Sequence, residues 1–210
     1  MMQTQDYLRY IAEELHTVVL ATTDDAGLPV TAAIDIMDSD PHGLYFLTAR
    51  GKSLYERLSR RGFAAFTAVK GADTMHSVAV SVRGQVRELG QDRLDALFAE
   101  NPYMFEIYPT RDSMQALTVF QMYAGSGEWF DLSKKPIERA SFRFGGVQDG
   151  MQGYRITDRC TGCGRCGTVC PQNCIDLHAR PAVIVQAHCL HCGNCMRVCP
   201  AGAVERSAVE

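Results

Sequence analysis

Short apolar runs separated by turn residues fill the first 145 positions of the chain. Residues 4–16 repeat their apolar side chains at helical spacing and predict one amphipathic helix. Runs rich in β-branched and aromatic residues then predict strands at 17–23, 29–37, 44–48, 63–69, 77–89, 116–123 and 127–132. Helices are expected at 54–61 and 91–100, followed by an irregular, aromatic-bearing insert at 101–112. Because strands outnumber helices and no βαβ alternation occurs, the predicted fold is mainly β, a small antiparallel barrel with flanking helices.

A glycine-rich polar stretch divides the chain. Gly145, Gly146, Gly150 and Gly153 surround it, which predicts a linker at 147–153 between one domain at 1–146 and a second at 154–210. In the second domain, short strands at 154–157 and 183–186 are expected to open two βαβ halves of an α+β fold.

The second domain contains a repeated cysteine motif. Cys160, Cys163, Cys166, Cys170 and Pro171 recur, 29 positions later, as Cys189, Cys192, Cys195, Cys199 and Pro200. This C-x2-C-x2-C-x3-C-P spacing resembles the bacterial two-cluster ferredoxins, in which the fourth cysteine ligates the other cluster. The expected ligand sets for two [4Fe–4S] clusters are therefore Cys160, Cys163, Cys166 and Cys199, and Cys189, Cys192, Cys195 and Cys170.

Two other uses of cysteine are disfavoured. A four-cysteine zinc site needs two separated pairs, whereas here triplets are each followed by x3-C-P. A disulfide framework suits secreted chains, and residues 1–16 form no secretory signal pattern. The ninth cysteine, Cys174, is predicted to be a small buried thiol because its repeat mate is Ala203, with a spare ligand or redox-reactive thiol as the alternative.

Charge and hydropathy narrow the class of protein further. Residues 1–150 carry 15 basic and 20 acidic side chains, and residues 151–210 carry 6 and 4, so neither domain has the basic surplus of a nucleic-acid binder. No apolar run reaches the roughly 18 residues of a membrane helix. We therefore expect a cytoplasmic protein that binds neither nucleic acid nor membrane, in a cell with little oxygen.

A basic corner follows the strand predicted at 44–48. Arg50, Lys52 and Ser53 stand at the start of a helix, where free N–H groups and the helix dipole favour an anion. An ATP-binding P-loop is excluded, because Phe46 stands where that motif needs its first glycine. From these residues alone, a solvated first helical turn explains the corner equally well.

Residues 5–144 resemble the pyridoxamine 5′-phosphate oxidase-like, FMN-binding split-barrel family. The resemblance rests on the leading helix, the hairpin at 18–37, and the segments LYFLTARGKSLYERL, FAAFTAV, SVAVSVRGQVREL and GEWFDLSKKPIERASFRFG. It implies that Thr48, Arg50, Lys52 and Ser53 hold the FMN phosphate, and that the flavin lies at a homodimer interface. The basic and aromatic residues that pyridoxamine-phosphate oxidases use for their vitamin substrate have no match here, so vitamin B6 oxidation is not expected.

The leading hypothesis is an FMN-dependent oxidoreductase that passes electrons between two [4Fe–4S] clusters and FMN, to reduce or oxidise a small substrate. A redox partner protein or an NAD(P)H-linked donor is expected on the other side of the reaction. One alternative is a non-catalytic electron carrier or redox sensor, and another is a barrel that binds haem in place of flavin. Neither His16 nor His76 is expected to have a partner, and no catalytic residue is assigned.

Overall fold

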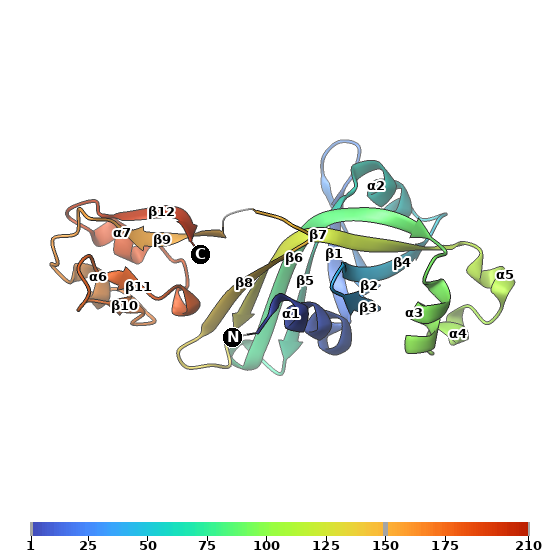
Figure 1. The fold of residues 1–210 in the computed structure, drawn as a ribbon, viewed down its shortest axis with the longest axis horizontal. Coiled ribbons are helices and arrows are strands. Elements are labelled where there is room, and N and C mark those ends of the chain that lie inside the picture. Colours follow the sequence, from blue (N-terminus) through green and yellow to red (C-terminus); the bar gives the residue numbers. More distant parts are fainter. Residues whose placement is uncertain (1, 149–150, 210) are drawn as a thin grey trace. The chain divides into compact units, whose positions relative to one another are not determined.

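The computed structural model describes residues 2–148 and 151–209. It contains two compact units, which are described separately (Figure 1). The first comprises the chain up to Lys70, Ala79–Glu128 and Phe142–Val147, and the second comprises Gly71–Val78, Trp129–Ser141 and the residues from Gln148 onward. Two segments inside the predicted first domain therefore cluster with the second unit. The linker at 147–153 remains a prediction, and Asp149 and Gly150 lie outside the described residues.

An eight-stranded antiparallel sheet forms the barrel. Its strand order is β2-β1-β5-β6-β7-β4-β3, with β8 beside β7. The strands are β1 (Thr17–Thr23), β2 (Pro29–Asp35), β3 (Asp38–Asp40), β4 (Gly43–Ala49), β5 (Phe63–Gly71), β6 (Ser77–Gly90), β7 (Leu117–Asp131) and β8 (Glu138–Phe144). The mainly β prediction is confirmed, but the strand expected at 29–37 ends at Asp35 as β2, because Ile36 and Met37 leave the pairing with β1, and the short strand β3 follows it.

β7 shows why two strands were predicted where one exists. The strands expected at 116–123 and 127–132 form one continuous strand, and Gly125 and Gly127 lie inside it. A Cβ at Gly125 would meet the carbonyl oxygen of Arg83 at 2.6 Å, and one at Gly127 would meet the ring of Phe142 at 2.3 Å. These glycines therefore permit close approach of neighbouring groups and do not mark a turn.

Helices flank the sheet of the first unit (Figure 1). The predicted N-terminal helix is α1 (Thr4–Tyr10) continued by a π-helical turn, η1 (Ile11–Leu15), which ends at His16 with φ +50°. α2 (Ser53–Arg61) ends at Gly62, whose positive φ of 60° closes the helix. α3 (Leu94–Glu100) begins three residues later than expected, and the insert predicted as irregular contains two short helices, α4 (Met104–Ile107) and α5 (Arg111–Met114).

The helices α3–α5 are held by one apolar cluster. Leu97 and Phe98 are almost fully buried and pack with residues of β4 and β7. Burial of side chains of this size contributes roughly 1.5–3 kcal/mol each. The cluster comprises Met37, Tyr45, Leu94, Leu97, Phe98, Met104, Met114, Leu117 and Val119. The insert is therefore a packed cap on the barrel end.

The second unit contains the duplicated cysteine segments. β9 (Met151–Ile156), α6 (Arg165–Thr168) and β10 (Ile175–Asp176) form one half, and β11 (Val183–Ile184), η3 (Gln186–His188), α7 (Asn194–Val198) and β12 (Val204–Val209) form the other. β9 pairs with β12 and β10 with β11, both antiparallel, so each two-stranded sheet takes one strand from each half. The two predicted βαβ halves are thus interleaved.

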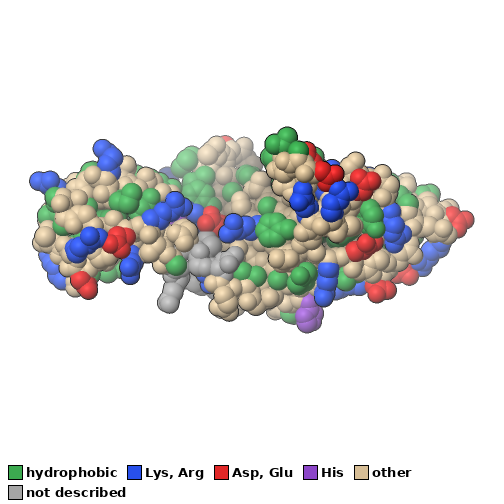
Figure 2. Space-filling model, turned by 90° about the horizontal axis from the view of Figure 1, so that it is seen from above, with side chains coloured by type: hydrophobic (Ala, Val, Ile, Leu, Met, Phe, Trp, Pro, Cys, Tyr) green, Lys and Arg blue, Asp and Glu red, His purple; other side chains and the backbone are tan. Residues whose placement is uncertain are grey.

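Two general features complete the fold. No helix within the described ranges is long and apolar enough to span a membrane. On the face shown in Figure 2, basic and acidic side chains are interspersed over each unit, without a continuous basic stripe.

Candidate functional site: two cysteine hollows and an anion corner

The first hollow in the second unit is lined by Cys160, Cys163, Cys166 and Cys199, with Leu177 and Ala182 among its apolar neighbours. These cysteines come from both halves of the repeat. Gly162 and Gly164 adopt positive φ values of 72° and 73°, which bend the loop around the hollow. The structure therefore brings together one of the two predicted cluster ligand sets.

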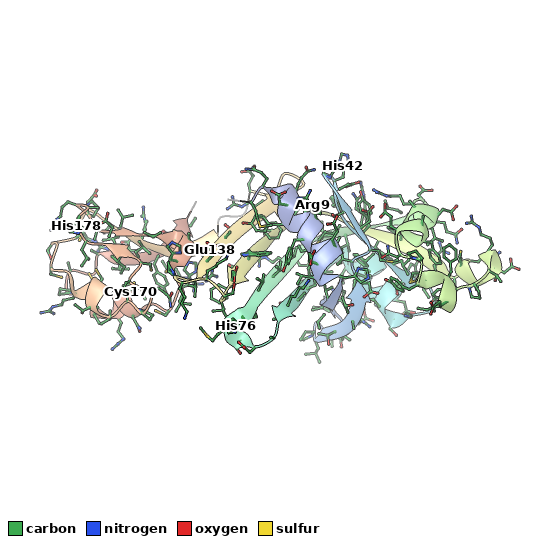
Figure 3. All side chains as sticks on the ribbon, turned by 90° about the horizontal axis from the view of Figure 1, so that it is seen from below. Arg9, His42, His76, Glu138, Cys170 and His178 are labelled. Carbon is green, nitrogen blue, oxygen red and sulfur yellow. The ribbon has the colours of Figure 1, made fainter. Side chains whose placement is uncertain are left out.

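The second hollow is lined by Cys170, Cys189, Cys192 and Cys195; Cys170 is labelled in Figure 3. It again combines three cysteines of one half with the fourth cysteine of the other. Within the described residues, no group of three or more His, Cys, Asp or Glu side chains is placed to hold a metal ion. Each hollow thus combines a cysteine triplet with the fourth cysteine of the other half, which is the ligand pattern of two-cluster ferredoxins.

Backbone N–H groups point at the ligand sulfurs. The pKa of Cys160 is lowered by hydrogen bonds from the N–H groups of Ala182 and Gly162. In the same way, the N–H of Ala203 donates to Cys199 Sγ at 3.2 Å, and that of His191 to Cys189 Sγ at 3.4 Å. Such donors stabilise thiolates and, in iron–sulfur proteins, raise the reduction potential of the cluster that the thiolates hold.

Cys174 lies beside the second hollow, and its exposure is 5%, as expected for a small buried residue. Its Sγ is 3.5 Å from Cys170 Sγ. Burial and the neighbouring Cys170 raise the pKa of Cys174 far above its usual value. Burial opposes ionisation of Cys170 too, but N–H groups from Cys174 and Gln172 give it a lowered pKa. Of this pair, Cys170 is therefore the thiol that ionises more readily.

His188, which precedes Cys189, and Gln172, two residues after Cys170, hold the segment that contains Ile137. His188 Nδ1 donates to the Ile137 carbonyl at 2.8 Å, and Gln172 Oε1 accepts from the Ile137 N–H at 3.4 Å. Ile137 itself is 5% exposed. His188 therefore has a structural partner, and is not a free loop histidine.

In the first unit, the basic corner joins the end of β4 to the start of α2. Lys52 is exposed and makes no ion pair within the described part of the chain. No acceptor side chain caps α2, so its first N–H groups remain available. Thr48 is 3% exposed, and its hydroxyl has no hydrogen-bond partner. A buried unpaired hydroxyl costs stability, and a phosphate oxygen would satisfy it.

Arg50 faces a different set of groups from Lys52. Its Nη1 donates to the Gln115 carbonyl at 3.0 Å, and its Nε lies 3.7 Å from Glu88 Oε1. The same carboxylate accepts from Thr118 Oγ1 at 2.6 Å and from the Tyr55 hydroxyl at 3.2 Å. Glu88 thereby ties β7 and α2 to the corner. Sequence patterns did not identify this role, because Glu88 lies on another strand.

A hydrogen-bonded network of His16, Asp35 and Tyr103 was also missed. His16 Nε2 lies 2.8 Å from the Tyr103 hydroxyl, and that hydroxyl donates to Asp35 Oδ2 at 2.9 Å. His16 Nδ1 donates to the Ala12 carbonyl at 3.2 Å. Burial and Asp35 raise the pKa of Tyr103 well above its usual value. The expectation that His16 has no partner was wrong, and so was that for His76, which contacts Asp73 at 2.9 Å.

Two family models match the chain. Residues 159–203 match the 4Fe-4S dicluster domain, which contains all the cysteines of both hollows. Residues 4–127 match the pyridoxamine 5′-phosphate oxidase family, which includes the whole anion corner. These matches agree with the resemblances found in the sequence.

Solved structures share the fold of the first unit. A NimC/NimA family protein from Clostridium acetobutylicum aligns with a TM-score of 0.56 at 13% identity, over 67% of this chain and 92% of that one. A general stress protein 26-related protein of the pyridoxinephosphate oxidase family, also from C. acetobutylicum, gives 0.52 at 17%, over 66% and 95%. A heme binding protein from Mycobacterium smegmatis gives 0.53 at 15%, over 68% and 58%.

Among curated proteins, no sequence matches the chain. The solved structures establish only the fold, since their identities are low. The match over residues 4–127, by contrast, covers more than half of the chain. This protein therefore belongs to the pyridoxamine 5′-phosphate oxidase family, as a split β-barrel followed by a 4Fe-4S dicluster domain.

Proposed function

We propose that the protein is an oxidoreductase that uses FMN and two [4Fe–4S] clusters. The observation that carries the proposal is the presence, on one chain, of two four-cysteine hollows and of an anion corner with an unpaired buried hydroxyl at Thr48. When bound, the clusters carry single electrons, and a flavin exchanges one or two, which joins cluster chemistry to the two-electron chemistry of small substrates.

The two cluster sites have different surroundings. Cys160, Cys163, Cys166 and Cys199 would hold one cluster, with N–H donors that stabilise negative charge on the sulfur of Cys160. Cys170, Cys189, Cys192 and Cys195 would hold the other, where Cys189 and Cys195 are buried, whereas none of the four cysteines of the first hollow is buried. Since hydrogen bonds and solvent exposure set cluster potentials, the two sites would differ in potential.

At the corner, Lys52, Ser53 and Thr48 would bind the FMN phosphate. Lys52 supplies a mobile positive charge, the start of α2 supplies N–H groups, and Thr48 supplies a hydroxyl. Arg50 belongs to the proposed set as well. Because its guanidinium already contacts Glu88 and the Gln115 carbonyl, we assign it mainly to holding the turn and adding positive potential.

We further propose a homodimer through the outer face of β1 and β5. Val19 is 49% exposed, Phe63 44% and Val69 66%, and they lie on the solvent side of paired strands. Exposed apolar side chains on one sheet face favour burial against a second copy. A small-molecule substrate, an NAD(P)H-linked donor or redox partner protein, and a cytoplasmic location in a low-oxygen cell complete the proposal.

The decisive experiment is anaerobic purification followed by iron, acid-labile sulfide and flavin assays. We expect about eight irons per chain, as two cubanes require, and one FMN released by heat. The reduced protein is then offered small oxidants and, separately, a ferredoxin or flavodoxin. Turnover of a small oxidant supports the enzyme, whereas electron transfer to the carrier proteins alone would show that the chain is an electron carrier.

A haem-binding barrel is a second candidate, favoured by the structural similarity to the heme binding protein from M. smegmatis. In the first unit, His16 has both ring nitrogens engaged, by the Ala12 carbonyl and the Tyr103 hydroxyl. An axial ligand from His16 would therefore require this network to break. A Soret band after reconstitution with haemin, together with no uptake of FMN, would replace the flavin proposal.

A further inference from the structure

The first unit contains a cleft of about 630 Å³ that has no part in the proposed cofactor site. It is bounded by α1 and η1, by the segment around β3, and by the end of α3. Its lining residues are Gln5, Leu8, Arg9, Ala12, Glu13, His16, Met37, Asp38, Ser39, Asp40, Pro41, Glu100 and Asn101. Cavities of about 300–1,000 Å³ commonly hold small molecules.

Asn101 presents an unpaired acceptor to this cleft. The residue is 6% exposed, and its Nδ2 donates to the carbonyls of Met37 at 3.0 Å and Leu97 at 2.9 Å. Both amide hydrogens are thus committed, and Oδ1 accepts no hydrogen bond within the described part of the chain. In the described part of the chain, the side-chain oxygens that are both fully buried and without a hydrogen-bond partner belong to Thr48 and Gln186. Asn101 Oδ1 is not among them, so this unpaired oxygen is accessible, and we infer that it opens to the cleft that Asn101 lines.

Most of the charged side chains that line the cleft are carboxylates, which accept hydrogen bonds as Asn101 Oδ1 does. Four carboxylates line it, together with the guanidinium of Arg9, which pairs with Asp6 and projects from α1 (Figure 3), and the ring of His16, whose Nε2 lies 3.6 Å from Asp35 Oδ2. Within the described residues, Glu13 and Glu100 have no ion-pair partner. Burial and the nearby Asp38 raise the pKa of Glu100. The carboxylates of Glu13 and Glu100 are therefore the ones that remain open to an ion pair with a ligand.

The remaining carboxylates are fixed in position. Arg93 donates to Asp38 Oδ2 and Asp40 Oδ2, both at 2.8 Å, and its guanidinium lies 3.8 Å from the centre of the Tyr45 ring. The Tyr45 hydroxyl also donates to Asp40 at 2.9 Å. These two acids thus form a rigid wall, which a ligand does not have to order when it binds.

The floor of the cleft is apolar. Leu8 is 1% exposed, Ala12 8% and Met37 6%. His16 closes one end, and its ring is fixed by the hydrogen bonds to Ala12 and Tyr103. A ligand that complements this site has an apolar body and carries hydrogen-bond donors with positive charge.

We propose that this cleft is a binding site for a small organic cation, an amine with an apolar group. Asn101 Oδ1, Glu13 and Glu100 accept hydrogen bonds from the ammonium group, and Leu8, Ala12 and Met37 contact the apolar part. The site does not depend on the FMN assignment, because it shares no residue with the corner at Thr48–Ser53.

The test uses the purified full chain with its native cofactors and measures binding by anaerobic titration calorimetry. The probes are benzylamine, the neutral benzyl alcohol and the anionic benzoate, which share one apolar ring. Glu100→Gln and Glu13→Gln remove one cleft carboxylate each. Glu106→Gln is the matched control, since Glu106 is exposed on α4 and does not line the cleft.

We expect benzylamine to bind most tightly and benzoate not to bind. Each cleft variant should weaken benzylamine by about two- to fivefold, as for a partly exposed charge pair, while Glu106→Gln leaves its affinity unchanged. Equal affinity for benzylamine and benzyl alcohol would overturn the proposal. So would equal losses in Glu100→Gln and Glu106→Gln, or no benzylamine binding up to about 10 mM.

Discussion

Thr48→Val should stabilise the FMN-free protein and weaken FMN binding at the same time. The Thr48 side chain is 3% exposed and its hydroxyl has no partner in the absence of a ligand. A buried hydroxyl without a partner costs about 1–3 kcal/mol, and valine fills the same space with a methyl group. We therefore expect the free energy of unfolding of the FMN-free first unit to rise by about 1 kcal/mol.

The expected effect on FMN has the opposite sign. A hydrogen bond to a charged group contributes about 1.5–3 kcal/mol, so its loss raises the Kd for FMN by about ten- to hundredfold. Unfolding is followed in urea by circular dichroism on the FMN-free protein, and binding by the quenching of flavin fluorescence.

Thr118→Val is the matched control, because Thr118 faces Thr48 across the pairing of β4 and β7. Its hydroxyl donates to Glu88 Oε1 at 2.6 Å and to the Gly90 carbonyl at 3.2 Å. This variant should therefore lose about 1–3 kcal/mol of stability. If Thr48→Val destabilises the FMN-free protein like Thr118→Val, or leaves the FMN affinity unchanged, Thr48 is not a phosphate ligand.

Three further predictions test other parts of the structure. Burial and a carboxylate partner raise the pKa of Tyr45 to about 12. Their stabilising effect is complete below pH 10 and is lost as pH rises towards 12, so about 1 kcal/mol should disappear by pH 11. Urea unfolding at pH 8 and pH 11 should show a loss that is about 1 kcal/mol smaller in Tyr45→Phe than in the wild type, because Tyr103, whose pKa is also raised, contributes to the loss in both proteins. Lys52→Gln should raise the Kd for FMN by about tenfold, as measured by flavin fluorescence, because it removes a positive charge beside the phosphate. Lys134→Gln is the control and should leave the Kd unchanged. The same change of Kd in both variants would exclude a phosphate contact by Lys52. Cys199→Ala should lose about four of the eight irons. Adding Cys160→Ala should remove no more iron, because both cysteines are assigned to the same cluster. Loss of all iron in the double variant would show instead that each cluster is held by one half of the repeat alone.

The cysteine hollows could be predicted from local spacing, because the ligand residues lie a few positions apart in a motif that occurs twice. Each ligand has a mate 29 positions away, and each hollow draws on both halves, as the pattern indicated. Cys174 and its mate Ala203 are both buried, at 5% and 0% exposure. A rule that concerns short loops can thus be applied without knowing the rest of the fold.

The first unit could be predicted only in outline, since its sites join residues far apart in sequence. His16, Asp35 and Tyr103 lie on a helix end, a strand and the insert, and no spacing rule connects them. Glu88 likewise reaches the anion corner only through the pairing of β6 with β7. Hydropathy predicts which face of a strand is buried, but not which strand becomes its neighbour.

The repeat also explains why two non-glycine residues adopt a left-handed backbone. His191 has φ 55° and its mate Gly162 has φ 72°; Asn173 has φ 49° and its mate Gly202 has φ 57°. Such conformations cost a non-glycine residue roughly 1 kcal/mol. The N–H of Gly162 points at Cys160, and the N–H of His191 points at Cys189, two residues earlier in each case. The left-handed turn directs an N–H group at the first ligand sulfur of each hollow. The left-handed backbone of His191 is therefore the conformation that places its N–H group against Cys189 Sγ.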